Sequence, residues 1–169
     1  GEFNMYDVAP VGKRNLFGSL KLGVINTKGE YVFEPQFDEL FPYVNGYAQV
    51  AVNGNWGYID TNGKIVVHPQ FKFHNKDFDT NGIAEVSIAS GNDLKMKFEY
   101  GYINTKGEWV IKPKQYDYVS GFDSFGLSVV RAGKQYGYLN VKGELIANWF
   151  ENAHPFSKIG LAAVKMNGK

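Results

Sequence analysis

The stretch Gly57-Tyr58-Ile59-Asp60-Thr61-Asn62-Gly63-Lys64 decides the fold, because the chain repeats it. Related stretches occupy residues 23–30, 101–108 and 137–144, and the four copies begin 34, 44 and 36 residues apart. Tandem copies at such a period are typical of repeat architectures, in which each copy buries its apolar face against its neighbours. We therefore expect a domain of about four similar units, which builds a surface rather than a catalytic centre.

A second landmark recurs between the copies and locates a change in length. It is a glycine followed by an apolar run, at residues 46–50, 82–86, 126–130 and 160–164. An aromatic residue precedes each landmark: Phe41, Phe78, Phe122 and Phe156. In one copy, eight extra residues separate the landmark at Gly82 from the next motif. Four residues added to each arm keep every side chain on its face, so we expect an extended hairpin, with residues 84–89 facing 94–100 across 90–93.

Each copy is predicted to form a three-stranded β-meander followed by a loop. The Asn or Asp of the motif and its closing glycine suit a tight turn, because the Asx side chain bonds nearby backbone and glycine adopts a left-handed conformation. Asn53-Gly54, between two apolar runs, indicates a second hairpin. The strand after the motif alternates, with one apolar face. Three prolines are expected to end this strand, since proline cannot donate to a β-ladder: Pro35, Pro69 and Pro113.

The predicted fold class is all-β, with tandem three-stranded meander repeats in an open stacked array. The unit shows three strands, whereas a propeller blade usually has four. A four-bladed propeller-like ring is the alternative. In that ring the strand at the end of the chain would pair with residues 23–25 and close the circle.

Composition excludes several classes of function. The 169 residues carry 18 basic and 17 acidic side chains, which gives a net charge of +1. Such a balance lacks the excess of positive charge that binds nucleic acid or an anionic membrane. Cysteine is absent, so disulfides, thiolate metal sites and cysteine nucleophiles are impossible. No apolar run reaches the roughly 20 residues that span a bilayer. Both a cytoplasmic and a secreted location fit, and the compartment stays open.

Residues 55–71, Asn-Trp-Gly-Tyr-Ile-Asp-Thr-Asn-Gly-Lys-Ile-Val-Val-His-Pro-Gln-Phe, resemble the bacterial WG repeat, also called the KWG repeat. Residues 160–169 resemble the segment that leads into the Trp-Gly pair, and the likeness extends over about 22–169. The resemblance implies a β-rich repeat scaffold, often beside other domains, with no defined catalytic activity and no cofactor. The signature tryptophan is retained as Trp56, and its counterparts are Leu22, Tyr100 and Tyr136. We expect Trp56 to be structural, and aromatic packing at Tyr100 and Tyr136 rather than at Leu22.

Two segments follow from this resemblance. Residues 1–21 are taken as a cloning scar, Gly1-Glu2-Phe3, and an N-terminal lead-in. Residues 22–169 are taken as a WG-type β-repeat domain with about four repeats. We expect the natural protein to extend beyond both ends.

Candidate chemistry is sparse. A metal site could use His68, His74, Asp77 and Asp79, but their spacing matches no strong signature, and a solvated loop is the simpler interpretation. Asp38 and Glu39 could form an acid/base pair, yet Asp117 recurs at the position of Asp38, which favours a role in a turn. The recurring Tyr58, Tyr102 and Tyr138 are most simply core residues. We therefore predict no catalytic, cofactor-binding or metal-binding residues.

Residues unique to one copy are the better functional candidates, since the needs of the scaffold do not explain them. The candidate partner-binding residues are Tyr43, Tyr47, His74, Asp77, Asn92, Asp93, Lys95 and Lys97. The first hypothesis is a non-enzymatic binding or scaffold module that presents a repeat-built β surface to another protein. The alternative is a carbohydrate- or cell-wall-binding module that uses exposed aromatics, and an enzyme ranks last. We expect no nucleic-acid partner and no membrane insertion.

Overall fold

The computed structural model describes residues 5–16, 18–72, 76–90, 97–147 and 149–166, and these form five small antiparallel sheets. The first sheet holds β1 (Val8–Arg14), β2 (Leu20–Asn26) and β3 (Tyr31–Phe37). The second holds β4 (Glu39–Leu40), β5 (Tyr47–Val52), β6 (Asn55–Asp60) and β7 (Ile65–Phe71). The third holds β8 (Ile83–Ser90), β9 (Lys97–Asn104) and β10 (Trp109–Ile111). The fourth holds β11 (Tyr118–Val119), β12 (Leu127–Ala132) and β13 (Gln135–Asn140), and the fifth β14 (Asn152–Ala153) and β15 (Val164–Lys165).

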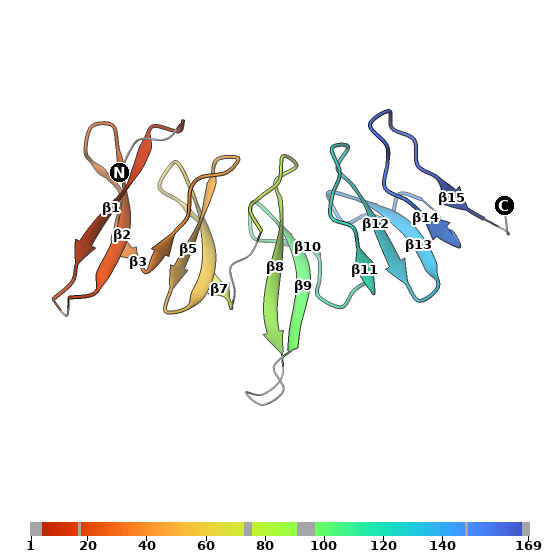
Figure 1. Ribbon diagram of the computed structural model, residues 1–169, viewed down its shortest axis with the longest axis horizontal. Coiled ribbons are helices and arrows are strands. Elements are labelled where there is room, and N and C mark those ends of the chain that lie inside the picture. The colour runs from red at the N-terminus through yellow and green to blue at the C-terminus, as the bar shows by residue number, and fades with distance from the viewer. Residues whose placement is uncertain (1–4, 17, 73–75, 91–96, 148, 167–169) are drawn as a thin grey trace.

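The sheets follow one another in chain order along the long axis of the molecule, and the two chain ends lie at opposite ends of the array (Figure 1). Among the described residues, β2 pairs with β1 and β3, and β15 pairs with β14. The open stacked array is therefore confirmed, and the ring alternative is wrong. Short strands in three of the loops, β4, β11 and β14, were not predicted from the sequence.

Turn chemistry follows the repeat motif closely. In each of the four copies the Asx side chain accepts hydrogen bonds from the backbone N–H groups two and four residues later, at 2.9–3.0 Å. These side chains belong to Asn26, Asp60, Asn104 and Asn140. The β5–β6 hairpin turns at Asn53 (φ 52°) and Gly54 (φ 71°), where both residues adopt the left-handed backbone that a tight hairpin requires. Both turn predictions are confirmed.

The prolines do not end the third strand of the first two copies. Strands β3 and β7 run through Pro35 and Pro69, while β10 ends before Pro113. Trp56 pairs with Phe71 and Tyr58 pairs with Val67, so residues 68–70 of β7 face Gly57 alone across a bulge. The strand lies at an edge of its sheet, where a proline removes no ladder hydrogen bond. The expectation that Pro35 and Pro69 end their strands was therefore wrong.

Gly57 allows the bulge to approach closely. A Cβ at this position would lie 2.7 Å from the ring nitrogen of Pro69, and it would collide with the carbonyl oxygen of Val67. The glycine of the Trp-Gly pair is thus needed because the third strand crosses directly over it.

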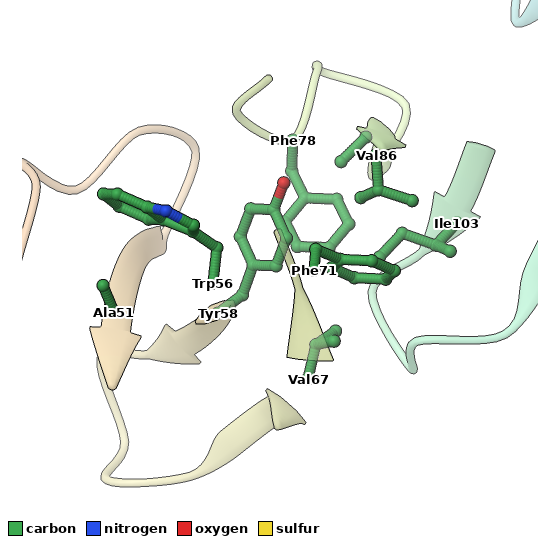
Figure 2. Packing of buried hydrophobic residues seen from close by; sticks show 9 residues of the cluster. Ala51, Trp56, Tyr58, Val67, Phe71, Phe78, Val86 and Ile103 are labelled. Carbon is green, nitrogen blue, oxygen red and sulfur yellow. The ribbon is translucent and has the colours of Figure 1, made fainter. Parts of the chain in front are cut away.

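The core lies between consecutive sheets, and we call each such contact a junction. Successive side chains of the two central strands point to opposite faces of the sheet. Ile59 therefore packs toward the first sheet and Tyr58 toward the third. Figure 2 shows the second junction, where Trp56, Tyr58 and Phe71 meet Phe78. Each sheet therefore covers one neighbour with each face, which explains why both faces of β5 and β6 are buried.

Trp56 is structural, as expected. It is 8% exposed and packs edge-to-face on Phe41 with ring centroids 5.4 Å apart. One counterpart, Tyr100, differs from the prediction, because it is 58% exposed. Leu22 packs against the core of the first junction without an aromatic ring. Tyr136 packs beside the fourth junction, as predicted.

Residues of the lead-in complete the first sheet. Strand β1 pairs with β2 over its whole length, and Asp7, with φ 58°, holds the left-handed position that glycine holds at each second landmark. The boundary expected at residue 22 falls inside β2. The β1–β2 hairpin is also longer than β5–β6, so the extension of β8–β9 is not the only one in the described chain.

Candidate functional site

The extended hairpin exists, with a register different from that expected. Its arms β8 and β9 pair Ala89 with Phe98 and Ser90 with Lys97, and they reach beyond the neighbouring sheets (Figure 1). Ala89 was expected to face Leu94. Strand pairing therefore continues past the predicted turn.

Several sequence candidates lie outside the described residues. These are His74, Asn92, Asp93 and Lys95, and the side chain of Lys97 joins them. The structure consequently says nothing about their surroundings.

Tyr43 and Tyr47 are scaffold residues. The loop of each copy is fixed by a backbone bond to its landmark strand: Phe41 N–H donates to Gln49, Lys76 N–H to Glu85, Ser120 N–H to Val129 and His154 N–H to Ala163. This register aligns Tyr43 with Phe78, Phe122 and Phe156, so Tyr43 is not unique to its copy and Phe41 is not the recurring aromatic. Tyr47 packs edge-to-face on Phe78 at 4.9 Å.

Asp77 binds the scaffold as well. It accepts a hydrogen bond of 2.7 Å from the side-chain nitrogen of Gln49, which is buried in the second sheet. A buried amide needs such a partner. This hydrogen bond to Gln49 accounts for Asp77 without a ligand, although the Asp77 side chain is exposed.

The acidic turn residues act as predicted. Asp38 accepts the backbone N–H of Asn53 at 2.7 Å, and Asp117 accepts that of Gly133 at 2.6 Å. Each carboxylate thus fixes the tip of a neighbouring hairpin. Among the described residues no three histidine or acidic side chains gather in a way that could hold a metal ion.

A groove of about 480 Å³ opens at the third junction, between the third and fourth sheets. Its lining includes four tyrosines: Tyr100, Tyr102, Tyr116 and Tyr118. It also includes three carboxylates and an ammonium group: Glu85, Glu99, Asp117 and Lys114. By contrast, a groove of about 250 Å³ at the first junction is lined by apolar residues such as Pro10 and Pro42, with the ring of Tyr43. The junctions therefore share a scaffold while their surface chemistry differs.

The third junction lacks a tyrosine–carbonyl hydrogen bond that recurs at the second and fourth junctions. Tyr58 donates to the carbonyl of Lys76 at 2.6 Å, and Tyr138 to that of His154 at 2.7 Å. The equivalent Tyr102 donates instead to Glu85 Oε2, at 2.9 Å.

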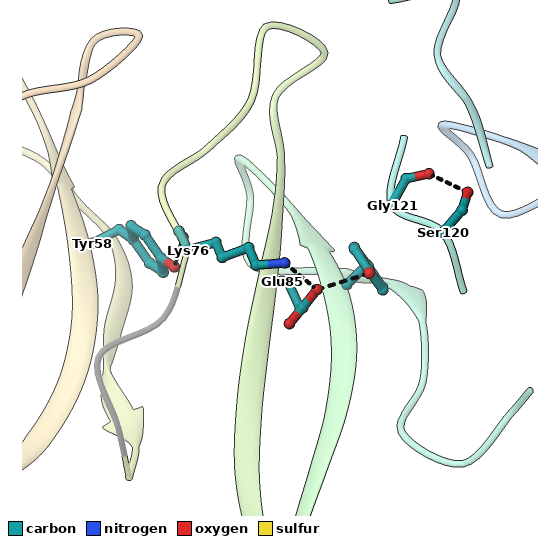
Figure 3. Close-up of polar contacts among 6 residues, drawn as sticks. Tyr58, Lys76, Glu85, Ser120 and Gly121 are labelled. Carbon is teal, nitrogen blue, oxygen red and sulfur yellow. Dashed lines mark hydrogen bonds and ion pairs between the residues drawn. The ribbon is translucent and has the colours of Figure 1, made fainter. Parts of the chain in front are cut away.

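The Tyr102–Glu85 pair places a hydrogen-bonded carboxylate in the groove. Burial, followed by the hydrogen bond to Glu85 and its charge, raises the pKa of the Tyr102 hydroxyl. Lys76 Nζ also lies 2.9 Å from Glu85 Oε2 (Figure 3). Both contacts end on Oε2, and no contact among the described residues occupies Oε1.

Lys114 contacts a second carboxylate of the groove, Glu99 on the neighbouring strand β9. Its ammonium lies 2.5 Å from Glu99 Oε1, and the Glu99 side chain is 12% exposed, against 73% for Lys114. Lys114 has a left-handed backbone, with φ 61°. It lies where the third copy has one more residue between proline and aromatic, Pro113-Lys114-Gln115-Tyr116, than Pro35-Gln36-Phe37. This extra residue carries a cation into the groove.

The sequence analysis missed the groove residues, although two signals were present. Glu85 replaces the Gln49, Val129 and Ala163 of the other copies, and Lys114 is a one-residue insertion. Neither signal shows that the residues line one groove, because Glu85 and Lys114 lie far apart in the chain, in β8 and after β10.

The family model of the WG containing repeat matches residues 23–56, 56–89, 100–135 and 136–169. The chain belongs to the WG repeat family. Comparison with curated proteins finds no match. A solved structure titled as the crystal structure of the eukaryotic initiation factor is similar over 89% of this chain, at 14% identity and a TM-score of 0.46. The chain spans 42% of that protein's length. Among the described residues, no helix is long and apolar enough to cross a bilayer.

Proposed function

We propose that these WG repeats form a non-enzymatic module that binds another protein through the groove at the third junction. The observation that carries the proposal is the gathering of exposed tyrosines with charged groups in one place. Tyr100 and Tyr118, which are 58% and 49% exposed, line the same groove as Glu85 and Lys114. Tyrosine flanked by polar and charged groups is typical of protein-binding surfaces.

The arrangement favours a protein over a glycan. A glycan-binding row would need exposed aromatics at one position in successive copies. The first position of the third strand instead holds Tyr31, Ile65, Trp109 and Leu145 in turn. Two exposed aromatics, Tyr100 and Tyr118, thus share a groove with charged groups, and no regular row of exposed aromatics runs through the described copies. Glycan binding remains the second candidate, because tyrosine faces beside carboxylates also suit sugars.

Two binding screens with one set of proteins test the proposal. The wild-type module is panned against a random peptide library and applied to an oligosaccharide array, beside the double variant Tyr100→Ser/Tyr118→Ser. Tyr31→Ser, an exposed tyrosine of the first sheet, is the matched control. We expect peptides that bind wild type and the control but not the double variant. Sugar binding lost in the double variant would favour the second candidate, and peptides that bind all three proteins equally would contradict the groove.

A further inference from the structure

The groove at the third junction has a charge and shape that select a particular kind of side chain. Its described lining holds three carboxylates against one lysine, and four tyrosines surround them. Tyrosine rings attract cations through their faces, and carboxylates accept hydrogen bonds from ammonium and guanidinium groups. An acidic ligand would meet repulsion from Glu85 and Glu99, and an apolar one would desolvate these carboxylates without adding a hydrogen bond in exchange.

The structure already contains a cation in this position. Lys114 Nζ lies 2.5 Å from Glu99 Oε1, yet the Lys114 side chain stays largely exposed. Solvent screens an ion pair whose cation is this exposed, so the pair contributes little stability. The contact of Lys114 is therefore easily exchanged for that of another cation.

A neighbouring strand offers a second acceptor, since Glu85 lies on β8 and Glu99 on β9. Glu85 uses Oε2 for both Tyr102 and Lys76, and no contact among the described residues occupies Oε1. The hydroxyl of Tyr102 holds the Glu85 carboxylate in place, so its orientation is set before a ligand arrives. A planar guanidinium, with five N–H donors, suits a carboxylate fixed in this way.

We propose that this groove binds an arginine or lysine side chain of a partner protein, and that Lys114 is an internal substitute which the partner's cation displaces. This inference rests on the proposed function, because it specifies the partner that the same groove takes. The scaffold supports it: the Tyr102–Glu85 bond replaces the tyrosine–carbonyl bond that Tyr58 and Tyr138 make at their junctions.

Isothermal titration calorimetry with short peptides tests the inference. The probes are acetyl-Gly-Gly-Arg-Gly-Gly-amide, the same peptide with citrulline, a neutral analogue of arginine, and the same peptide with glutamate. We expect wild type to bind the arginine peptide at least about tenfold more tightly than the citrulline peptide, with no binding of the glutamate peptide. The affinity should fall between 0.05 and 0.5 M salt, because the contact is ionic.

Three variants separate the groove from general effects of charge. Lys114→Gly removes the internal cation and suits the left-handed backbone at that position, so the arginine peptide should bind severalfold more tightly. Glu85→Gln and Glu99→Gln should each weaken binding about tenfold. Glu144→Gln, at an exposed turn of the fourth copy, is the matched control and should change nothing. Circular dichroism melts confirm that each variant is folded.

The outcomes are decisive in both directions. Unchanged or weaker binding to Lys114→Gly would overturn the displacement of Lys114, and equal binding of the arginine and citrulline peptides would overturn cation recognition. Failure of the arginine peptide to bind wild type and Lys114→Gly at millimolar concentration would overturn the whole inference. The proposed function would still stand if the library yields neutral peptides that need Tyr100 and Tyr118, so the two failures are distinguishable.

Discussion

Gly143 lies directly over the carbonyl oxygen of Val110, so close that a Cβ added to Gly143 would collide with it. Gly143 belongs to the turn of the fourth copy, and Val110 to the third strand of the third. The same contact recurs between Gly63 and Val32, where the added Cβ would lie 3.3 Å from the carbonyl oxygen. The turns at Gly63, Gly107 and Gly143 thus pack on the edge strand of the preceding copy.

Gly143→Ala should destabilise the third junction. Gly143 has φ +78°, so alanine would be strained there even without a neighbour, and the Cβ would push the third sheet away. The matched control is Gly133→Ala: its φ is +61°, and nothing lies within 4 Å of the added Cβ. We expect the free energy of unfolding to fall by about 1–2 kcal/mol in the control and by clearly more in Gly143→Ala, as measured by urea unfolding. Equal losses in the two variants would contradict the proposed packing.

Trp56→Ala should lower the free energy of unfolding by about 3–5 kcal/mol, because it leaves a cavity between Phe41 and the core of the second junction. Tyr100→Ala changes the equivalent residue of the third copy, which is exposed, and should cost less than about 1 kcal/mol. Thermal melts of both variants check the difference, since 1 kcal/mol corresponds to about 2–4 °C for a chain of this size. An unchanged melting temperature for Trp56→Ala would refute its structural role.

Asp38 should make stability depend weakly on pH. Hydrogen bonds from the Lys21 side chain and the Asn53 backbone lower the pKa of Asp38. Since the folded pKa lies below the unfolded value, the stabilisation is present at neutral pH and is lost as pH falls below about 4. The Asp38 side chain is 38% exposed, so solvent screening limits the effect to about 0.5 kcal/mol.

The check for Asp38 is urea unfolding of wild type and Asp38→Asn from pH 6 to pH 2.5. Wild type should be the more stable at pH 6, and the difference should shrink toward pH 2.5. A difference that stays constant over this range would show that the carboxylate charge is not responsible.

The sequence predicted those parts of the fold that depend on local chemistry. The Asx turns, the Asn53-Gly54 hairpin and the apolar alternation each involve residues close in the chain, and the structure confirms them. Trp56 was also assigned correctly, because an aromatic recurs at two of its counterparts.

The failures concern relations between strands. Pro35 stays within its strand because that strand lies at an edge and crosses a bulge, and neither fact is visible in the spacing. Tyr43 was taken as unique because the loop lengths differ, and only the hydrogen-bond register aligns it with Phe78. The groove joins Glu85 to Tyr118 across two sheets, so no local pattern could have revealed it.

Recurring residues hold the fold, and we propose that single-copy residues at the third junction form the binding site. One measurement tests it most directly: the melting temperature of Tyr118→Ser together with its affinity for the arginine peptide. Tyr118 lies in the short strand β11, lines the groove and is half exposed. The account predicts a melting temperature within about 2–4 °C of wild type, as for a change under 1 kcal/mol, and at least a tenfold loss of affinity. Unchanged affinity, or a loss of binding only alongside a collapse in melting temperature, would contradict it.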